Sequence, residues 1–102
     1  MNFEMIPPKA LDQYLHQKNT FIIDLRSPEE YVAKHIKGAI NIPYERLKVC
    51  CTFPAEAVLV LYCDRGSVSM AAAREYARKG YRTKTVVGGF HAYQGKETES
   101  FR

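Results

Sequence analysis

The sequence predicts an α/β fold in which a parallel β-sheet is covered by helices on both faces. Residues 57–62, Ala-Val-Leu-Val-Leu-Tyr, form an apolar, β-branched run typical of a strand that is buried on both sides. Shorter apolar runs alternate along the chain with segments of helical pattern, an order that favours parallel strands joined by helices. The chain has 102 residues, 46% of them hydrophobic, which is enough for one domain with its own core.

The first half of the chain has clear signals for where elements begin and end. The expected order is a helix from Pro7 through Leu15, a strand at residues 21–25, a helix after Ser27, a strand at residues 39–42 and helical turns at residues 44–49. Pro7 and Pro8 suit the first turn of a helix. Ser27 is a capping residue, followed by proline at the first helical position and Glu30 at the third. Pro43 ends the second strand.

The second half repeats the alternation. The expected order is the apolar strand that ends before Cys63, a helix over residues 67–79, a strand at residues 83–87 and a short segment at residues 90–93. Ser67 is expected to cap the helix, and Gly80 to close it. The segment from Lys96 onward is polar, so we expect a frayed tail after a core at about residues 3–95.

Polar or unusual residues follow three of the predicted strands. Asp24 and Arg26 come after one strand, Cys63 and its loop after another, and Gly88-Gly89 after the last. Because sites in parallel sheets form at the carboxyl ends of the strands, we expect these residues to converge on one edge of the sheet. Asp24 and Arg26 are candidates for an ion pair that supports this edge.

Cys63 is the candidate nucleophile. Gly66 permits a sharp turn after it, and the helix that follows directs free N–H groups and the positive end of its dipole toward the thiol. Such surroundings stabilise a thiolate. A cysteine at a strand end can also be an ordinary core residue, but a core residue requires neither this glycine nor the hydroxyl groups of Ser67 and Ser69.

The loop, Tyr-Cys-Asp-Arg-Gly-Ser-Val-Ser at residues 62–69, resembles the active loop of rhodanese-type sulfurtransferases, which often runs Tyr-Cys-x-x-Gly-x-x-Ser. Residues 23–43 resemble the N-terminal signature of that family. Residues 88–93 resemble its C-terminal signature, with Tyr93 where tryptophan is usual. The resemblance implies a single rhodanese domain over residues 1–102, with five parallel strands of which the first lies at residues 3–6.

The resemblance also implies a mechanism. Cys63 would take sulfur from thiosulfate or a persulfide donor, carry it as a persulfide, and pass it to a small or protein-borne thiol, or to cyanide in an assay. The anion-binding residues would be Asp64, Arg65, Gly66, Ser67, Val68 and Ser69. The supporting residues would be Asp24, Arg26 and His35, the last through hydrogen bonds to loops or, alternatively, as an acid or base. No metal or organic cofactor is implied.

Two loop residues depart from the family pattern. Single-domain relatives often carry arginine at one or both of the positions that Asp64 and Val68 occupy here. Arg65 restores one positive charge, but the Asp64 carboxylate offsets it and repels thiosulfate. We therefore expect weak thiosulfate activity and a less charged or protein-borne donor. The related phosphatase loop ends in an arginine where this chain has Ser69, which disfavours phosphatase or arsenate chemistry.

Two other functions stay open. An idle rhodanese module used for binding or regulation would fit Asp64 and Val68, and a thiol titration would separate it from an enzyme. A redox switch would pair Cys63 with Cys50 or Cys51, whose adjacent spacing matches no metal-binding pattern.

Charge and hydropathy restrict the partners. The net charge of +4 favours acidic partners only mildly, and without a basic run interleaved with aromatic residues we do not expect a nucleic-acid partner. The basic residues after the long helix are either solvated or a docking surface for an acidic carrier protein or tRNA: Arg74, Arg78, Lys79, Arg82 and Lys84. No apolar run is long enough to span a membrane, and the N-terminus does not read as a signal peptide, so we expect a cytoplasmic location.

Overall fold

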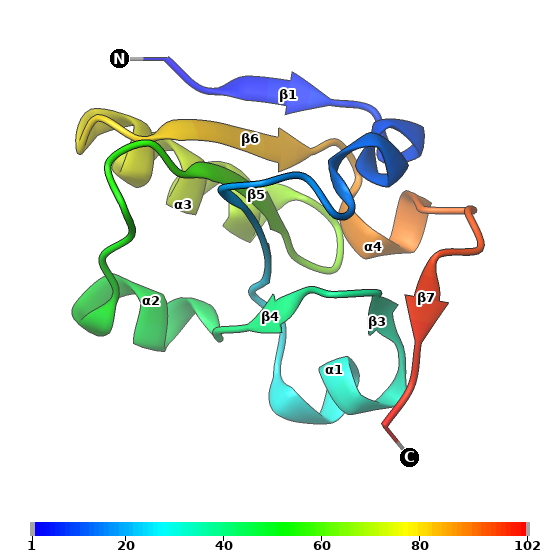
Figure 1. Ribbon diagram of the computed structural model, residues 1–102. Helices are drawn as coiled ribbons and strands as arrows, with labels where there is room; N and C mark the ends of the chain where they lie inside the picture. Colours follow the sequence, from blue (N-terminus) through cyan, green and yellow to red (C-terminus); the bar gives the residue numbers. More distant parts are fainter. Residues whose placement is uncertain (1, 102) are drawn as a thin grey trace.

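The computed structural model describes residues 2–101, apart from the side chain of Cys50. Within this range, five parallel strands form the central sheet in the order β1-β6-β5-β2-β4 (Figure 1). The strands are β1 (Glu4–Ile6), β2 (Thr20–Asp24), β4 (Ile40–Asn41), β5 (Val58–Tyr62) and β6 (Arg82–Val86). The predicted five-stranded parallel sheet is confirmed, and its most apolar strand, β5, lies at the centre.

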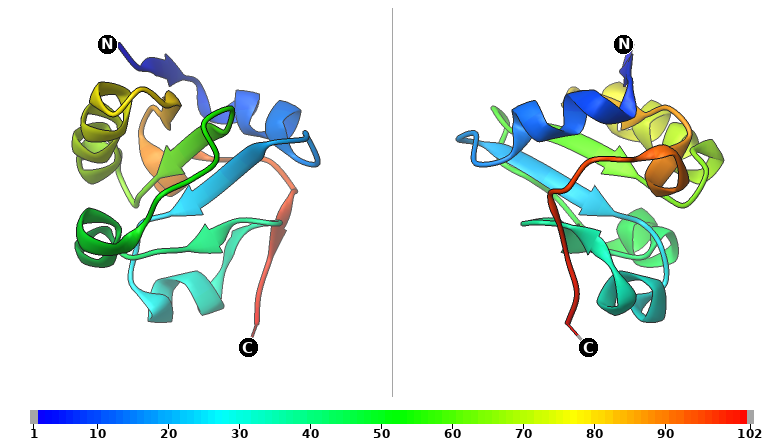
Figure 2. Two further views of the ribbon diagram at one scale, coloured as in Figure 1. Left: turned by 60° about the vertical axis from the view of Figure 1, so that its left-hand side comes forward. Right: turned by 90° about the vertical axis from the view of Figure 1, so that its right-hand side faces the viewer.

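Helices cover both faces of the sheet (Figure 2). On one face, α2 (Tyr44–Cys50) and α3 (Ser67–Arg78) pack on the side chains of Leu59 and Leu61. On the other face, the 3-10 helix η1 (Pro8–Tyr14), α1 (Pro28–Ala33) and α4 (Gly89–Ala92) surround Val60 and Tyr62. Alternate residues of β5 therefore belong to two separate cores, as expected for a strand that is buried on both sides.

The predicted capping box at the start of α1 is present. The Ser27 hydroxyl oxygen accepts a hydrogen bond from the Glu30 backbone N–H at 3.2 Å. In return, the Ser27 backbone N–H donates to Glu30 Oε1 at 3.1 Å. This arrangement fixes the direction in which the chain leaves the end of β2.

The C-terminal segment is ordered, and the prediction of a frayed tail is wrong. Strand β7 (Thr98–Glu99) pairs in antiparallel fashion with β3 (His35–Ile36). His35 is fully buried, and its Nε2 atom lies 3.0 Å from Glu99 Oε2. The ring of Phe101 packs edge-on at 4.6 Å from that of His35. A polar tail is ordered here because it provides a partner for a buried imidazole, a contact between residues 64 positions apart that no local pattern reveals.

A buried polar cluster joins the carboxyl ends of β2 and β5. Arg26 makes a buried ion pair with Asp24, with Nη2 at 2.9 Å from Oδ2, so the predicted pair is present and shielded from water. The Tyr62 hydroxyl donates to the same Asp24 oxygen at 2.7 Å and accepts from the Ile36 backbone N–H at 3.1 Å. The cluster thereby connects β2, β5 and β3.

Burial and charge fix the protonation of this cluster. Burial, together with the nearby Asp24 carboxylate, raises the pKa of Tyr62 far above its ordinary value. Burial alone would lower the pKa of Arg26, but the hydrogen bond and charge of Asp24 outweigh it and leave that pKa raised. The phenol therefore stays neutral and the guanidinium charged at neutral pH.

Among the described helices, none combines the length and the apolar composition that crossing a bilayer requires.

Replacing Tyr62 by Phe should lower the free energy of unfolding at pH 7 by about 1–3 kcal/mol, because Asp24 and the Ile36 N–H each lose a buried partner. The deficit should shrink above about pH 10, where unfolded wild type ionises its tyrosine and folded Tyr62 does not. Wild type then loses about 1.4 kcal/mol per pH unit that the variant does not lose. Urea unfolding of both proteins at pH 7 and pH 11 measures this. A deficit that stays constant or grows with pH would contradict the assignment.

Candidate active site

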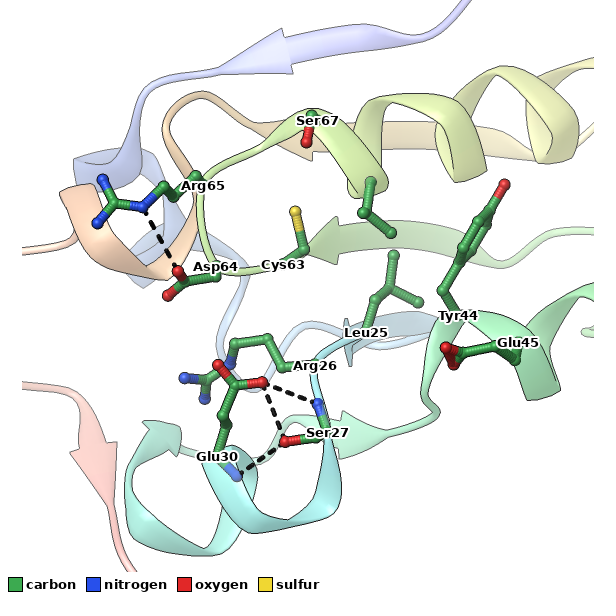
Figure 3. A pocket seen from close by; sticks show the side chains of 11 residues that line it. Leu25, Arg26, Ser27, Glu30, Tyr44, Glu45, Cys63, Asp64, Arg65 and Ser67 are labelled. Atoms are coloured by element: carbon green, nitrogen blue, oxygen red, sulfur yellow. Dashed lines mark hydrogen bonds and ion pairs between the residues drawn. The ribbon is translucent and has the colours of Figure 1, made fainter.

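The loop between β5 and α3 encloses the sulfur atom of Cys63 (Figure 3). The backbone N–H groups of Gly66 and Ser69 donate to Cys63 Sγ at 3.1 Å and 3.3 Å. Gly66 has a φ of +105°, a left-handed conformation that side-chain-bearing residues rarely adopt. The predicted cap by Ser67 is wrong: Gly66 is the N-cap residue of α3, no side chain caps the helix there, and the Ser69 N–H of the first turn donates to the sulfur.

The backbone that follows β6 makes hydrogen bonds to this loop. The Phe90 N–H donates to the Cys63 carbonyl oxygen at 2.8 Å, and the His91 N–H donates to that of Asp64 at 2.9 Å. A Cβ atom on Gly89 would lie only 2.5 Å from the Cys63 carbonyl oxygen, so only glycine fits there. The loop after β6 therefore meets the loop after β5, as the positions of the polar and glycine residues at strand ends predicted.

The Ser69 side chain ties the loop to the neighbouring strand. Its buried hydroxyl lies 3.2 Å from the Gly66 carbonyl oxygen and 2.8 Å from the Thr85 hydroxyl on β6. The first contact holds the two sulfur-binding amides in one turn, and the second anchors that turn to the sheet. Thr85 is a supporting residue that the sequence motifs did not indicate.

A pocket of about 390 Å³ opens over Cys63. It is lined by Leu25, Arg26, Ser27, Glu30, Tyr44, Glu45, Cys63, Asp64, Arg65, Ser67 and Val68. Figure 3 shows the Cys63 sulfur between the loop above and the ends of β2 and α2 below. Although the residue is only 5% exposed, its sulfur faces this opening.

Both arginines at the pocket already have carboxylate partners. Arg26 is paired with buried Asp24, and its guanidinium lies 4.3 Å from the centre of the Phe90 ring. Arg65 Nε lies 3.6 Å from Asp64 Oδ2 in an exposed pair, which agrees with the expectation that Asp64 offsets the charge of Arg65. The positive charge that a small dianion would need is therefore largely compensated.

The structure brings most of the predicted site residues together. Gly66 and Ser69 contact the sulfur, and the other four residues of the loop cradle, with Arg26, line the pocket. Asp24 lies behind Arg26 and orients it.

Two other sequence-predicted candidates lie elsewhere. His35 is absent from the pocket lining, and its ring nitrogens contact the Tyr31 carbonyl oxygen and the Glu99 carboxylate instead. Cys51 lines a different pocket, next to Arg46 and Pro43, and the side chain of Cys50 is outside the described part of the chain.

Five lining residues were not predicted as site residues. They are Leu25, Ser27, Glu30, Tyr44 and Glu45. They come from the end of β2, from α1 and from α2, so their positions depend on how these elements pack around the sheet. In the sequence, these segments lie close to the ends of predicted strands. That position alone does not predict which of their side chains line the pocket.

Two backbone N–H donors converge on the Cys63 sulfur. N–H groups form stronger hydrogen bonds to a charged acceptor than to a neutral one. The pocket above leaves room for a second sulfur atom and its carrier.

Comparison with known proteins shows which family has this sequence and fold. The family model described as "Rhodanese-like domain" matches residues 7–96. A tRNA sulfurtransferase from Desulfurococcus amylolyticus is 31% identical over 97 residues, which cover 90% of this chain and 20% of that protein. The thiosulfate sulfurtransferase PspE of Escherichia coli is 36% identical over 70 residues, covering 66% of this chain and 67% of PspE. This chain also spans only 21% of the adenylyltransferase and sulfurtransferase uba4 of Ogataea parapolymorpha.

Solved structures show the same fold. A rhodanese-like domain protein from Staphylococcus aureus superposes with a TM-score of 0.82 at 24% identity, covering 96% of this chain and 98% of that one. The reduced CoADR-RHD protein of Bacillus anthracis has a TM-score of 0.75 at 32% identity, covering 89% of this chain and 16% of that one. Because the family model extends over nearly the whole chain, this protein belongs to the rhodanese-like domain family.

Proposed function

We propose that this chain is a sulfurtransferase in which Cys63 carries sulfane sulfur as a persulfide. The observation that supports this most strongly is the pair of N–H donors from Gly66 and Ser69, which converge on Cys63 Sγ at the base of an open pocket. The sulfurtransferase names of the relatives support the same reaction class.

In the first half-reaction, the Cys63 thiolate attacks the outer sulfur of the donor. With thiosulfate, a bond forms between Cys63 Sγ and the outer, sulfane sulfur, the sulfur–sulfur bond of thiosulfate breaks, and sulfite leaves with the electron pair. With an organic persulfide, the leaving group is the donor thiolate. The charge that starts on Sγ ends on the outer sulfur of the persulfide, within reach of the first turn of α3.

In the second half-reaction, an acceptor nucleophile attacks the outer sulfur of the Cys63 persulfide. The bond between the two sulfurs breaks and its electron pair returns to Cys63 Sγ, which regains its hydrogen bonds to Gly66 and Ser69. A thiolate acceptor becomes a persulfide, and cyanide becomes thiocyanate. The protein ends unchanged, so neither step needs an external oxidant or reductant.

The charges around the pocket disfavour thiosulfate as the main donor. Three carboxylates line the pocket, on Glu30, Glu45 and Asp64, and both arginines have acidic partners. A dianion approaching this opening meets net repulsion. We therefore expect slow turnover with thiosulfate and a natural donor with less negative charge.

Replacing Cys63 by Ser should abolish thiocyanate formation from thiosulfate and cyanide, a loss of at least about 10³-fold, because the nucleophile is removed. Wild type should give parallel double-reciprocal plots, the signature of a ping-pong reaction. Cys51→Ser serves as the matched control and should retain activity. Equal rates for wild type and Cys63→Ser would favour an idle binding module, and loss of activity in Cys51→Ser would favour a function that uses both cysteines.

Replacing Asp64 by Asn should raise kcat/KM for thiosulfate by about three- to tenfold, since one exposed carboxylate is removed and Arg65 is released from its partner. Glu56, an exposed acid outside the pocket lining, provides the control as Glu56→Gln. The gain should fall when the salt concentration rises, as expected for a screened charge effect. An unchanged or lower kcat/KM in Asp64→Asn would show that this carboxylate does not limit the reaction with thiosulfate.

A further inference from the structure

The side chains that line the Cys63 pocket indicate which chemical group, attached to the reacting sulfur of a substrate, would fit there. Leu25 and Tyr44 provide apolar surface beside the thiol, while the carboxylates of Glu30 and Glu45 lie further out (Figure 3). Val68 adds a third apolar side chain to the lining. Among the described residues, the hydrogen-bond donors at the sulfur itself are backbone amides, which do not distinguish one attached group from another. Selection among substrates that carry different groups on the sulfur must therefore come from the side chains around the pocket opening, here called the rim.

Most hydroxyl groups of the pocket already have intramolecular acceptors. The Tyr44 hydroxyl donates to Glu75 Oε1 at 3.2 Å, and the Ser27 hydroxyl donates to Glu30 Oε1 at 3.0 Å. Among the described residues, this leaves the Ser67 hydroxyl as the one in the pocket lining without an assigned partner. A sulfonate or carboxylate group on a substrate would find few donors here to replace its water.

The charges of the rim are not balanced. Within the lining, Arg26 and Arg65 are each committed to a carboxylate, whereas Glu45 has no assigned hydrogen bond or ion pair among the described residues. Figure 3 shows its carboxylate turned toward the opening, below Tyr44. Lys48 stacks on the Tyr44 ring at 5.0 Å, but it is not among the lining residues. An unpaired carboxylate beside an apolar wall fits a ligand with an apolar stem and a positive charge at its end.

We propose that the pocket selects cationic organosulfur groups, meaning a thiol or persulfide with an ammonium or guanidinium a few bonds from the sulfur, and that Glu45 is a specificity-determining residue for them. The inference rests on the proposed function for its biological meaning. The apolar stem packs on Leu25, Tyr44 and Val68 while the sulfur meets the loop amides, and the cation lies at the rim beside Glu45. The same carboxylates exclude anionic carriers.

Charged methanethiosulfonates test the selection without any persulfide. The Cys63 thiolate attacks their sulfenyl sulfur and methanesulfinate leaves, so a mixed disulfide records each reaction. The trimethylammonioethyl and sulfonatoethyl reagents differ mainly in charge, and each rate on Cys63, read by peptide mass mapping, is divided by the rate on free 2-mercaptoethanol. Wild type should favour the cationic reagent by at least about tenfold. A ratio of one or below would overturn the proposal.

Substitutions at Glu45 test whether this residue causes the preference for the cationic reagent. Glu45→Gln should reduce the cation-to-anion ratio about threefold or more, and Glu45→Lys should reduce it further, while Glu56→Gln should leave it unchanged. Both Glu45 variants are checked for an unchanged melting temperature. A ratio that is the same in wild type and Glu45→Lys would overturn the role of Glu45. Because these rates need only the thiol, a failed persulfide test would count against the proposed function and leave this measurement intact.

Protein that carries a Cys63 persulfide is then used to distinguish two possible acceptors with the same cationic chemistry, a free aminothiol and a cysteine in a basic protein segment. Sulfur discharge is compared between cysteamine and 3-mercaptopropionate, and between a cysteine peptide flanked by lysines and one flanked by glutamates. A preference in the small-molecule pair alone assigns a free aminothiol, and a preference in the peptide pair assigns a cysteine in a basic protein segment. Equal discharge in both pairs would overturn the selection of cationic acceptors.

Discussion

The structure is organised around two backbone hydrogen bonds to one sulfur atom. For the N–H groups of Gly66 and Ser69 to reach Cys63 Sγ, the chain must turn within three residues of the strand end and enter α3 at once. That turn requires the left-handed conformation of Gly66. It also brings the Cys63 carbonyl so close to the loop after β6 that Gly89 has no room for a side chain. The glycine residues of both loops are thus consequences of one constraint.

A buried polar cluster lies beneath this turn, at the ends of β2 and β5. Asp24 accepts hydrogen bonds from Arg26 and Tyr62, and Tyr62, the last residue of β5, directly precedes Cys63. Since alternate residues of a strand point to opposite faces, Tyr62 anchors the far side of the strand while Cys63 faces the pocket. The cluster uses one arginine for support, and Asp64 compensates the other, Arg65. The site therefore stabilises charge on its own sulfur yet offers little to a separate anion.

The sequence predicted the parallel sheet, the convergence of three strand ends on one edge and the loop around Cys63, because these depend on local signals: an apolar run, a capping box, and glycine residues at turns. It did not predict β7, whose two residues are ordered by a distant partner, His35. It also did not predict that Tyr44 and Glu45 line the pocket over Cys63, because helix packing places them there. The expected cap by Ser67 is absent because Gly66 is the N-cap residue, and the Ser69 N–H that such a cap could have bound donates to Cys63 Sγ instead.

The mass of the intact protein after exposure to a sulfur donor tests the central claim most directly. Wild type and Cys63→Ser are incubated with thiosulfate or a small alkyl persulfide, freed of donor, and weighed without reductant. The account predicts a gain of about 32 Da, one sulfur atom, in wild type only, and its loss on addition of cyanide. A wild-type mass that stays unchanged with every donor, or an equal gain in Cys63→Ser, would contradict the role of Cys63 as the sulfur carrier.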